Sequence, residues 1–379
     1  MPSIYDDAVV GAGIVGLAHA YHLAKRGRSV IVFERDQRAQ MASVRNFGLV
    51  WPIGRPPGEQ LELAKRSREV WREMLRDAGL WHDESGSMHL AYQDDEARVL
   101  AEFAADAAGQ GYDVELLDAD QVAAKAPMAR REGLRRGLFS ATEMRVDPRQ
   151  VVGDLPFYLA RAYGVRFEFN APVTHVEPGE VQALGQSWRA RRVWICTGEA
   201  IRELFFDHVR DEPVYRCKLQ MMRTAPTSHG TKLGPSMAGG LTLRHYPAFA
   251  ACPTLPEVVA RFDGETPEFA RFGIHVLISQ NASGQLAVGD SHQYDAAITP
   301  FNDDEIDDAI LRYARTLVEG PLPPIVSHWY GVQMGHRERP WLRQSPAEGM
   351  HLVTALGGAG MTLSFGLAEK VVREELGEG

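Results

Sequence analysis

The stretch VVGAGIVGLAHAYHLAKRGRSVIVFER, residues 9–35, decides the fold. Its glycines at positions 11, 13 and 16 have the spacing G-x-G-x-x-G. The first glycine permits a tight turn, the second lets a pyrophosphate approach the backbone, and the third lets a helix pack closely on a strand. Residues 7–10 and 29–35 read as the flanking strands, and the helix between them should stop near Gly27, a natural C-cap. The stretch therefore predicts a βαβ unit that binds a dinucleotide.

The acidic residue at the end of the second strand supports this prediction. Glu34 lies 18 residues after Gly16, where a carboxylate accepts hydrogen bonds from ribose hydroxyls. The strand, the glycine motif, the helix, the second strand and the acid occur in the required order, which a chance glycine cluster would not produce. Arg35, which follows Glu34, keeps a phosphorylated ribose open as an alternative.

A second glycine-rich turn, in TALGGAGMTLSFGLAEKVV (residues 354–372), lies near the other end of the chain. It separates a predicted strand at 350–358 from an amphipathic helix. A helix N-terminus at this point would stabilise the negative charge that a flavin acquires on reduction. A simple NAD enzyme has no need of such a second turn, so the two turns together favour FAD over NAD.

Composition and charge narrow the class of protein. The chain has 379 residues and a formal net charge of −9, which does not suggest a nucleic-acid-binding surface. Cys196, Cys217 and Cys252 form no CxxC motif, as expected in a reducing compartment. No run of eighteen apolar residues predicts a membrane-spanning helix, and the start lacks the features of a signal peptide. We therefore expect a cytoplasmic protein.

Further patterns predict the remaining organisation. Helices are expected at 59–79 and 303–318, and strands in RARRVWICTG (189–198), RCKLQMMRT (216–224), GLTLRHYPAF (240–249), GIHVLISQ (273–280) and QLAVGDS (285–291). The predicted fold class is α/β, with a Rossmann-like FAD-binding domain and a second, α+β substrate domain built on a mostly antiparallel sheet. We assign residues 1–80, 145–215 and 326–379 to the FAD-binding domain, and residues 81–144 and 216–325 to the substrate domain.

Four stretches spread along the chain resemble the D-amino-acid oxidase, glycine oxidase and sarcosine oxidase superfamily. They are residues 9–35, ASVRNFG (42–48), RRVWICTG (191–198) and GGAGMTLSFGLAEKVV (357–372). The resemblance implies a two-domain flavoprotein that oxidises a C–N bond and is reoxidised by dioxygen. In sarcosine oxidases a late cysteine bonds the flavin covalently. Because no cysteine follows Cys252, we expect non-covalent FAD.

The motifs and the resemblance together predict the cofactor contacts. These are Gly11, Gly13, Ile14, Val15, Gly16, Glu34, Arg35, Ser43, Arg45, Asn46, Val173, Thr197, Gly198, Gly358, Gly360, Met361 and Thr362.

The chain is also similar to a subgroup of this superfamily associated with phosphonate breakdown. The stretches that carry this similarity are SVRNFGLVWPIG (43–54), TEMRVDPR (142–149), RCKLQMMRTAP (216–226), GGLTLRHYPAFAACP (239–253) and VGDSHQYD (288–295). The similarity implies an aminophosphonate substrate, either 2-aminoethylphosphonate or an N-alkyl or hydroxy relative. The implied products are an aldehyde of the phosphonoacetaldehyde type, an amine or ammonia, and hydrogen peroxide.

The chain departs from the family at the position of the substrate carboxylate. HWYGVQMG (328–335) matches a strand on which amino-acid oxidases carry a carboxylate-binding arginine, and that position here is Gln333. A second arginine of glycine oxidases is replaced by the segment Gly358-Ala359-Gly360. An α-amino carboxylate would thus lack its usual clamp, and an anionic group would need other cations.

The candidates for binding the substrate are Arg45, Asn46, Lys218, Gln220, Arg244, Tyr246, His292, Tyr330, Gln333 and His336. Arg244 is the first choice for the anion, because a strand at 240–249 would place it on one face with Tyr246. Lys218 and Gln220 should share a strand face in the same way. Lys218 on a solvated face, and Tyr330 as plain core, are equally compatible with the sequence.

No catalytic side chain and no metal-binding motif is predicted, since the flavin carries the chemistry. Three other functions remain open: a glycine- or sarcosine-type oxidase, an amine dehydrogenase with an acceptor other than oxygen, and a non-enzymatic nucleotide-binding module. The particular amine, its stereochemistry and the oligomeric state are also open at this point.

Overall fold

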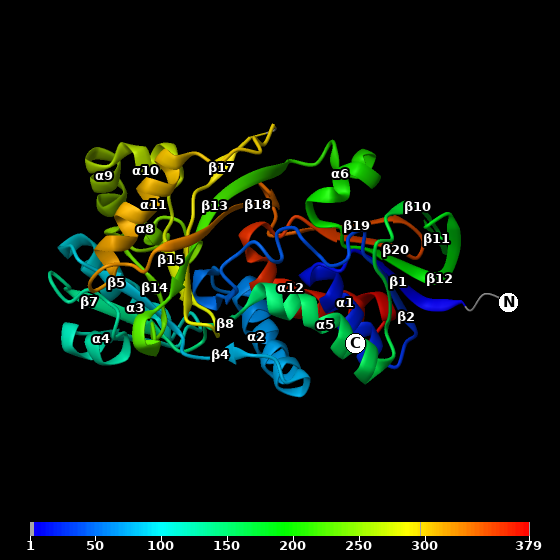
Figure 1. Cartoon of the computed structure of the whole chain (residues 1–379), viewed down its shortest axis with the longest axis horizontal. Helices are drawn as coiled ribbons and strands as arrows, with labels where there is room; N and C mark the ends of the chain where they lie inside the picture. Colours follow the sequence, from blue (N-terminus) through cyan, green and yellow to red (C-terminus); the bar gives the residue numbers. More distant parts are fainter. Residues whose placement is uncertain (1–3, 296, 379) are drawn as a thin grey trace.

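The computed structural model describes residues 4–295 and 297–378, which form two lobes side by side along the longest axis (Figure 1). The lobe that contains the N-terminal strand is built on one sheet, and the other lobe on a second sheet. The long strands β13 (Val214–Pro226) and β18 (Ile325–His336) run from the second lobe toward the first (Figure 1). The predicted FAD-binding ranges include residues 1–3 and 379, which lie outside the described residues.

The sheet of the first lobe has a parallel centre. Strand β1 pairs in parallel with β2 and β12, β12 with β20, and β2 with β9, as in a doubly wound nucleotide-binding fold. An antiparallel edge completes it. Its eight strands are β1 (Tyr5–Val10), β2 (Val30–Phe33), β9 (Arg166–Glu168), β10 (Val173–Glu177), β11 (Glu180–Ala183), β12 (Gln186–Ile195), β19 (Leu342–Ala347) and β20 (Met350–Thr354).

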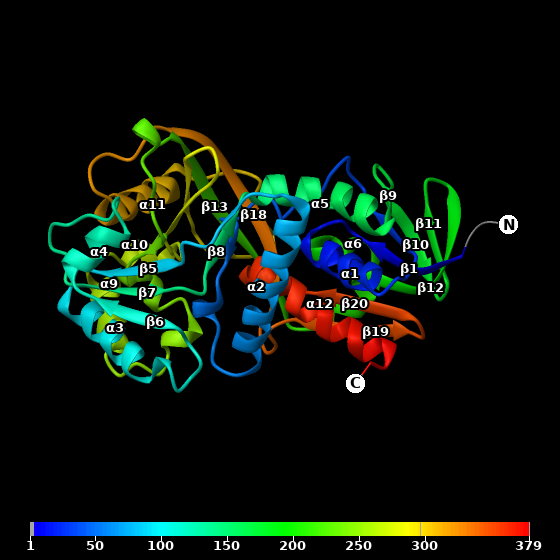
Figure 2. The same cartoon turned by 90° about the horizontal axis from the view of Figure 1, so that it is seen from below.

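Helices cover this sheet because its strands are apolar on both faces. Val9 and Val32 pack into the core beneath the long helices, whereas Ala8, Val10 and Ile31 pack into the core of the opposite face. Figure 2 shows α1 and α12 lying side by side next to the sheet. The helices of this lobe and of its border are α1 (Ile14–Lys25), α2 (Glu59–Ala78), α5 (Pro148–Tyr163), α6 (Ile201–Leu204), α7 (Phe206–Val209) and α12 (Gly360–Leu376).

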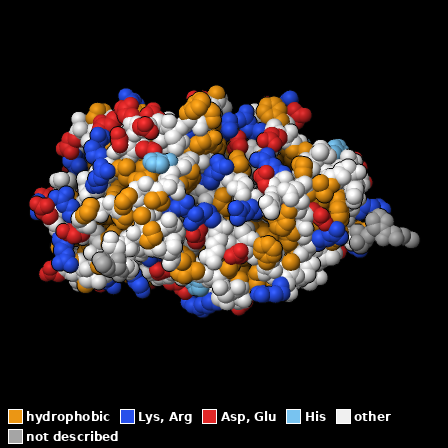
Figure 3. Space-filling model, in the orientation of Figure 1, with side chains coloured by type: hydrophobic (Ala, Val, Ile, Leu, Met, Phe, Trp, Pro, Cys, Tyr) orange, Lys and Arg blue, Asp and Glu red, His pale blue; other side chains and the backbone are white. Residues whose placement is uncertain are grey.

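The second lobe is built on a mostly antiparallel sheet, as predicted, in which β5 and β14 are the only pair of described strands that run in parallel. Its nine strands are β5 (Ser87–Ala91), β6 (Val114–Leu117), β7 (Arg136–Ser140), β13 (Val214–Pro226), β14 (Ser236–Ala238), β15 (Leu277–Gln280), β16 (Gln285–Gly289), β17 (Gln293–Tyr294) and β18 (Ile325–His336). Its helices are α3 (Asp94–Ala107), α4 (Ala119–Lys125), α8 (Gly240–Leu243), α9 (Leu255–Glu265), α10 (Pro267–Arg271) and α11 (Asp304–Leu317). Acidic side chains gather over α10 and α11 (Figure 3).

β3 (Leu49–Val50), β4 (His82–Asp83) and β8 (Met144–Val146) form a separate small sheet. In the sequence these strands lie at the points where the chain passes from one large sheet to the other. Strand β18, which the predicted boundaries place in the FAD-binding domain, is hydrogen-bonded to β13 of the second sheet. The domain boundaries themselves stay a prediction. Among the described residues, no helix has the length and apolar character needed to cross a membrane.

The prediction of a strand at GLTLRHYPAF is wrong. Residues 240–243 form the short helix α8, and a 3-10 turn follows at Pro247–Phe249. Arg244 has helical backbone angles at the end of α8. The alternation of polar and apolar residues is therefore incidental here, and Arg244 and Tyr246 do not share a strand face.

Candidate active site

The first glycine turn has the close packing that its sequence predicts. A Cβ atom at Gly16 would lie 1.9 Å from the carbonyl oxygen of Gly11, and one at Gly11 would lie 2.7 Å from the carbonyl oxygen of Cys196. Gly11 also has a φ of +101°, which disfavours other residues. Gly13 is open except for the Ser43 hydroxyl, 3.1 Å from the position of a Cβ. Only Gly11 and Gly16 are thus required by the packing of the protein itself, which leaves Gly13 for a ligand.

A groove runs from this turn along the carboxyl edge of the parallel sheet; we call it the sheet-edge groove. It comprises two adjoining cavities of about 410 and 120 Å³ that share Val15, Ser43, Gly198 and Val332. Glu34 lies at one end, where its carboxylate accepts hydrogen bonds from the amides of Ala12 and Asp36. The hydroxyl Oγ1 of Thr197 is buried without a hydrogen-bond partner among the described residues, so the groove holds an unused polar atom.

The second glycine turn closes the other end of the sheet-edge groove. Gly358, Gly360 and Met361 line it where α12 begins, and Thr362 accepts a hydrogen bond from the amide of Trp51 at 3.0 Å. The backbone of this turn is not crowded by the protein: a Cβ at Gly358 would meet Oε1 of Gln333 at an ordinary contact distance of 3.4 Å, and one at Gly360 would meet no atom of the described residues within 4 Å. The residues at the N-terminus of α1 would hold the phosphates of a dinucleotide, and those at the start of α12 would meet its flavin ring.

Most of the predicted cofactor residues line this groove or its mouth. They are Gly11, Gly13, Ile14, Val15, Glu34, Arg35, Ser43, Asn46, Val173, Thr197, Gly198, Gly358, Gly360, Met361 and, at the mouth, Thr362. Gly16 packs against Gly11 beneath the groove. Arg45 lies outside the groove, where its guanidinium donates to the carbonyl oxygens of Gln40 and Tyr330.

A second cavity of about 340 Å³ opens from the flavin end of the groove toward the second lobe; we call it the lobe cavity. The two spaces share Gln333, Leu356, Gly358 and Met361, so a molecule in the lobe cavity would meet the flavin end directly. Its walls come from both lobes. Five predicted substrate residues line it: Asn46, Tyr246, His292, Gln333 and His336.

Arg55 is the residue of the lobe cavity that sequence reasoning missed. Its Nε is buried without a hydrogen-bond partner, and its side chain has no ion pair with any described residue. Burial lowers the pKa of Arg55, while the tyrosines 112, 215 and 246 act in the opposite direction. Arg339 also lines the cavity, but lies 4.0 Å from the carboxylate of Glu212. Arg55 is the one charged residue in the otherwise apolar stretch WPIGRPP (51–57), and this contrast is the feature of the sequence that could have indicated a functional role.

Three histidines from separate loops meet on the wall of the lobe cavity; we call them the histidine cluster. They are His245 after α8, His275 before β15 and His292 before β17, and their ligand atoms lie within 4.8 Å of one another. Burial lowers the pKa of His275 well below the usual value, whereas the side chain of His245 is exposed. Asp290, directly behind the cluster, has a pKa raised to about 6 by burial. Sequence reasoning found only His292, because the cluster exists only in the tertiary structure.

The other predicted substrate residues do not line the lobe cavity. Arg244 donates a hydrogen bond to Asp263 at 2.8 Å. Lys218 contacts the carbonyl oxygen of Phe301, and Gln220 donates to Asp307 at 2.8 Å, so both face α11. They do share one strand face, as predicted, but it is the face turned away from the cavity.

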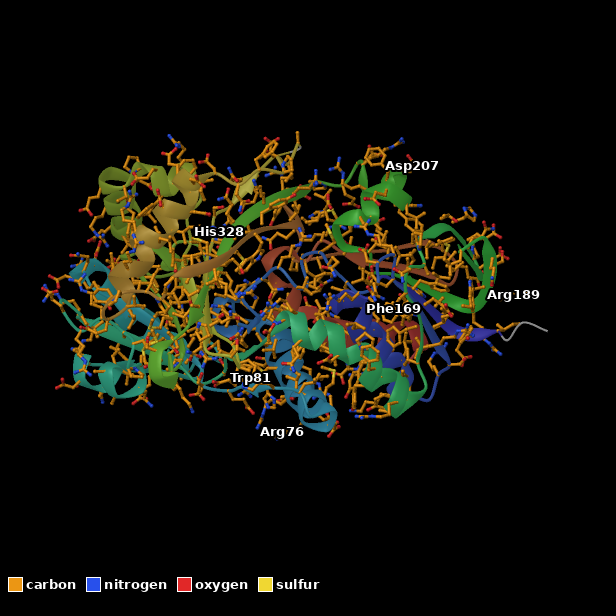
Figure 4. The ribbon with its side chains drawn as sticks, in the orientation of Figure 1. Arg76, Trp81, Phe169, Arg189, Asp207 and His328 are labelled. Atoms are coloured by element: carbon orange, nitrogen blue, oxygen red, sulfur yellow. The ribbon has the colours of Figure 1, made fainter. Side chains whose placement is uncertain are left out.

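Arg45 and Tyr330 are not among the residues that line the lobe cavity. Arg45 lines an outer cavity of about 450 Å³ together with Arg223 and Trp329, and its guanidinium lies 6.0 Å from the centre of the Tyr330 ring. His328 also lines the outer cavity and comes from β18 (Figure 4). The structure thus brings Arg45 and Tyr330 together at a place distinct from the lobe cavity.

Comparison with known families decides the class of this protein. Residues 6–374 match the family described as FAD dependent oxidoreductase. The chain belongs to this family. The protein is therefore an FAD-dependent oxidoreductase, and FAD is the dinucleotide expected in the sheet-edge groove.

Individual relatives agree with this family. Glycine oxidase of Bacillus licheniformis is 28% identical over 155 residues, which is 39% of this chain and 40% of that protein. Human mitochondrial sarcosine dehydrogenase is 27% identical over 187 residues, which is 46% of this chain and 19% of that protein. The matched part thus spans less than half of each of these relatives.

Solved structures share the whole fold. Glycine oxidase of Bacillus cereus has a TM-score of 0.77 at 18% identity, with 99% of this chain and 96% of that chain covered. The L-α-glycerophosphate oxidase of Mycoplasma pneumoniae, solved with FAD bound, has a TM-score of 0.76 at 14% identity, with 98% and 94% covered. At such identities the likeness shows a common fold.

Proposed function

We propose that this FAD-dependent oxidoreductase is an oxidase for the C–N bond of an aminophosphonate. The proposed substrate is 2-aminoethylphosphonate or an N-alkyl or hydroxy relative. The products would be an aldehyde of the phosphonoacetaldehyde type, an amine or ammonia, and hydrogen peroxide. A cytoplasmic location, predicted from the sequence, accompanies this proposal.

The observation that carries the proposal is the unpaired guanidinium of Arg55 in the lobe cavity. A partly desolvated cation without a carboxylate partner favours an anionic ligand, because the ligand supplies the missing counter-charge. The position that binds a carboxylate in amino-acid oxidases is the neutral Gln333, which also lines the cavity. The substrate anion would then lie farther from the flavin end than an α-carboxylate does.

The donors around the lobe cavity support a phosphonate. A phosphonate has three oxygens and up to two negative charges, so it uses more donors than a carboxylate. The guanidinium of Arg55 can donate to two of these oxygens as a fork, and the Tyr215 hydroxyl, which is a further donor, comes from a residue that lines the same space. The alternative proposed first from the sequence, Arg244, is already paired with Asp263.

The residues of the chain would position the substrate as follows. Arg55 holds the anion, which leaves the amine and its α-carbon to extend toward Gln333 and Gly358 at the flavin end. Bound FAD supplies the two-electron oxidant. The backbone at Gly358–Thr362 and the N-terminus of α12 stabilise negative charge there. Leu49, Leu219 and Met221 form an apolar part of the wall of this cavity.

Two related functions compete with this proposal. The relatives named glycine oxidase and sarcosine dehydrogenase favour an α-amino carboxylate as substrate, and they also leave open an acceptor other than oxygen. The neutral Gln333 counts against the first alternative. Hydrogen peroxide formation during turnover distinguishes the proposed oxidase from the second alternative, a dehydrogenase that uses another acceptor.

A peroxide-coupled assay with matched substrates tests the proposal. We expect kcat/KM for 2-aminoethylphosphonate or its N-methyl relative to exceed that for β-alanine, the carboxylate of equal length, and those for glycine and sarcosine. A preference for any of the carboxylates would refute the phosphonate assignment. Reduction of the flavin by the amine without peroxide formation would refute the oxidase assignment and support a dehydrogenase.

A further inference from the structure

The surroundings of His275 are those of a metal ligand. Its Nδ1 lies 3.1 Å from Oδ1 of Asp290, and its Nε2 is buried without a hydrogen-bond partner among the described residues. A carboxylate accepts hydrogen bonds, so the pairing directs the ring hydrogen to Nδ1 and leaves the lone pair on Nε2. A carboxylate behind a histidine whose other nitrogen is free is the usual arrangement around a metal-binding imidazole.

His292 is held in the same way. Its Nδ1 lies 3.2 Å from the carbonyl oxygen of Gly273, which can only accept a hydrogen bond. Its Nε2 therefore carries the lone pair. Nδ1 of His292 is also 3.7 Å from Oδ1 of Asp290, so one carboxylate lies behind both rings. Two of the three rings thus have a hydrogen-bond acceptor at Nδ1 and a free nitrogen opposite.

His245 completes the cluster on the side of the lobe cavity. Its ring stacks on that of His275, with centroids 4.0 Å apart and 20° between the planes. Three nitrogens at 2.0–2.1 Å from a tetrahedral zinc ion are about 3.3 Å apart. The ligand atoms of the cluster already lie within 4.8 Å of one another, so small rotations of the rings, of the accessible His245 first, are what metal binding would require.

We propose that His245, His275 and His292 bind a divalent transition-metal ion of the zinc class. Three imidazole ligands with a fourth position facing a cavity are a common form of exchangeable zinc site, and imidazole suits zinc, copper, iron and nickel. Asp290 acts from behind as the residue that orients two of the ligands. The three histidines and one ligand from the lobe cavity would complete a four-coordinate metal site.

The open position of this ion faces the space that holds the substrate anion, a role that rests on the proposed function. A divalent ion beside Arg55 would raise the positive charge of the lobe cavity and favour a dianion such as a phosphonate. The metal would take one phosphonate oxygen and Arg55 the others. Binding of the metal and of the phosphonate should then strengthen each other by the same factor.

Equilibrium dialysis of the FAD-loaded enzyme against zinc chloride tests the metal site without any turnover. After treatment with a chelator, the wild type should rebind about one zinc ion per chain. His275→Gln and His292→Gln should lose this zinc, and Asp290→Asn should weaken binding by about tenfold to a hundredfold. FAD content and Tm of each variant show that the chain is folded, and His245→Gln serves if a buried variant fails to fold.

His328→Gln is the matched control, because His328 is an accessible histidine that pairs with Asp307 at 2.8 Å on the outer cavity. It should keep the wild-type zinc content. A wild type that rebinds no stoichiometric zinc would overturn the proposal, as would equal zinc content in the wild type and the cluster variants. Failure of the aminophosphonate assignment would leave the zinc stoichiometry unchanged, so the two proposals fail separately.

Discussion

Replacement of Arg55 gives the sharpest test of how the substrate is held. In the free enzyme the guanidinium has no ion pair with any described residue, and its Nε has no hydrogen-bond partner. Truncation to alanine therefore breaks no hydrogen bond of Nε within the protein. The interactions that are lost are those between the guanidinium and the bound substrate anion. We expect Arg55→Ala to lower kcat/KM for the preferred aminophosphonate.

The magnitude follows from the number of bonds lost. A hydrogen bond to a charged group contributes about 1.5–3 kcal/mol, and the fork of an arginine can donate two. A loss of about 3 kcal/mol corresponds to roughly a 150-fold decrease in kcat/KM. Arg55→Lys should lie between the wild type and Arg55→Ala, because lysine keeps the charge without the fork.

The assay is peroxide release under initial-rate conditions, with FAD content and Tm measured on the same samples. Arg55 does not line the sheet-edge groove, so flavin content should stay normal. Tm should not fall through loss of an ion pair, because the side chain has none among the described residues. Arg244→Ala is the matched control: its guanidinium is paired with Asp263 outside the lobe cavity, and its effect should be small. A kcat/KM of Arg55→Ala within about threefold of the wild type would refute the reasoning, as would a larger effect of Arg244→Ala.

Four further outcomes are expected. Gly13→Val should abolish FAD retention in a folded chain, because a branched side chain would occupy the space for the pyrophosphate; normal flavin content would contradict the motif. Acid precipitation should release the flavin into the supernatant, since no cysteine follows Cys252, and yellow colour in the pellet would show a covalent bond. Gln333→Arg should gain activity on glycine or sarcosine, and a variant inactive on both would argue against this position as the carboxylate site. Burial raises the pKa of the Asp83 carboxyl, but its ion pair with Arg145 and its hydrogen bonds lower it overall. The pair therefore stabilises the fold above the unfolded pKa of Asp83 and loses this effect as pH falls through the folded pKa. Tm of Asp83→Asn should thus approach that of the wild type in acid.

The nucleotide-binding half of this protein could be predicted from the sequence because its determinants are local. Gly11 and Gly16 lie five residues apart in the same turn. Gly16 packs against the carbonyl oxygen of Gly11, and Gly11 packs against that of Cys196, which follows the adjacent strand. The periodic apolar residues of α1, α2 and α11 likewise depend on neighbours along their own helix. Such patterns specify a βαβ unit, its cofactor groove and its family without knowledge of the rest of the chain.

The combination of Arg55 with the histidine cluster in the lobe cavity was decided by tertiary structure. Arg55, His245, His275 and His292 come from four loops, and no spacing in the sequence relates them. The predicted strand around Arg244 is wrong because a four-residue alternation cannot distinguish a strand from the short helix that the surrounding packing selects. At Gly240, in that helix, a Cβ would lie 2.2 Å from the carboxyl carbon of Glu96, a residue distant in sequence. The sequence thus determined which cofactor binds, because the glycine turns of that site each carry a local motif of their own, whereas the substrate side depends on loops that only the folded chain brings together.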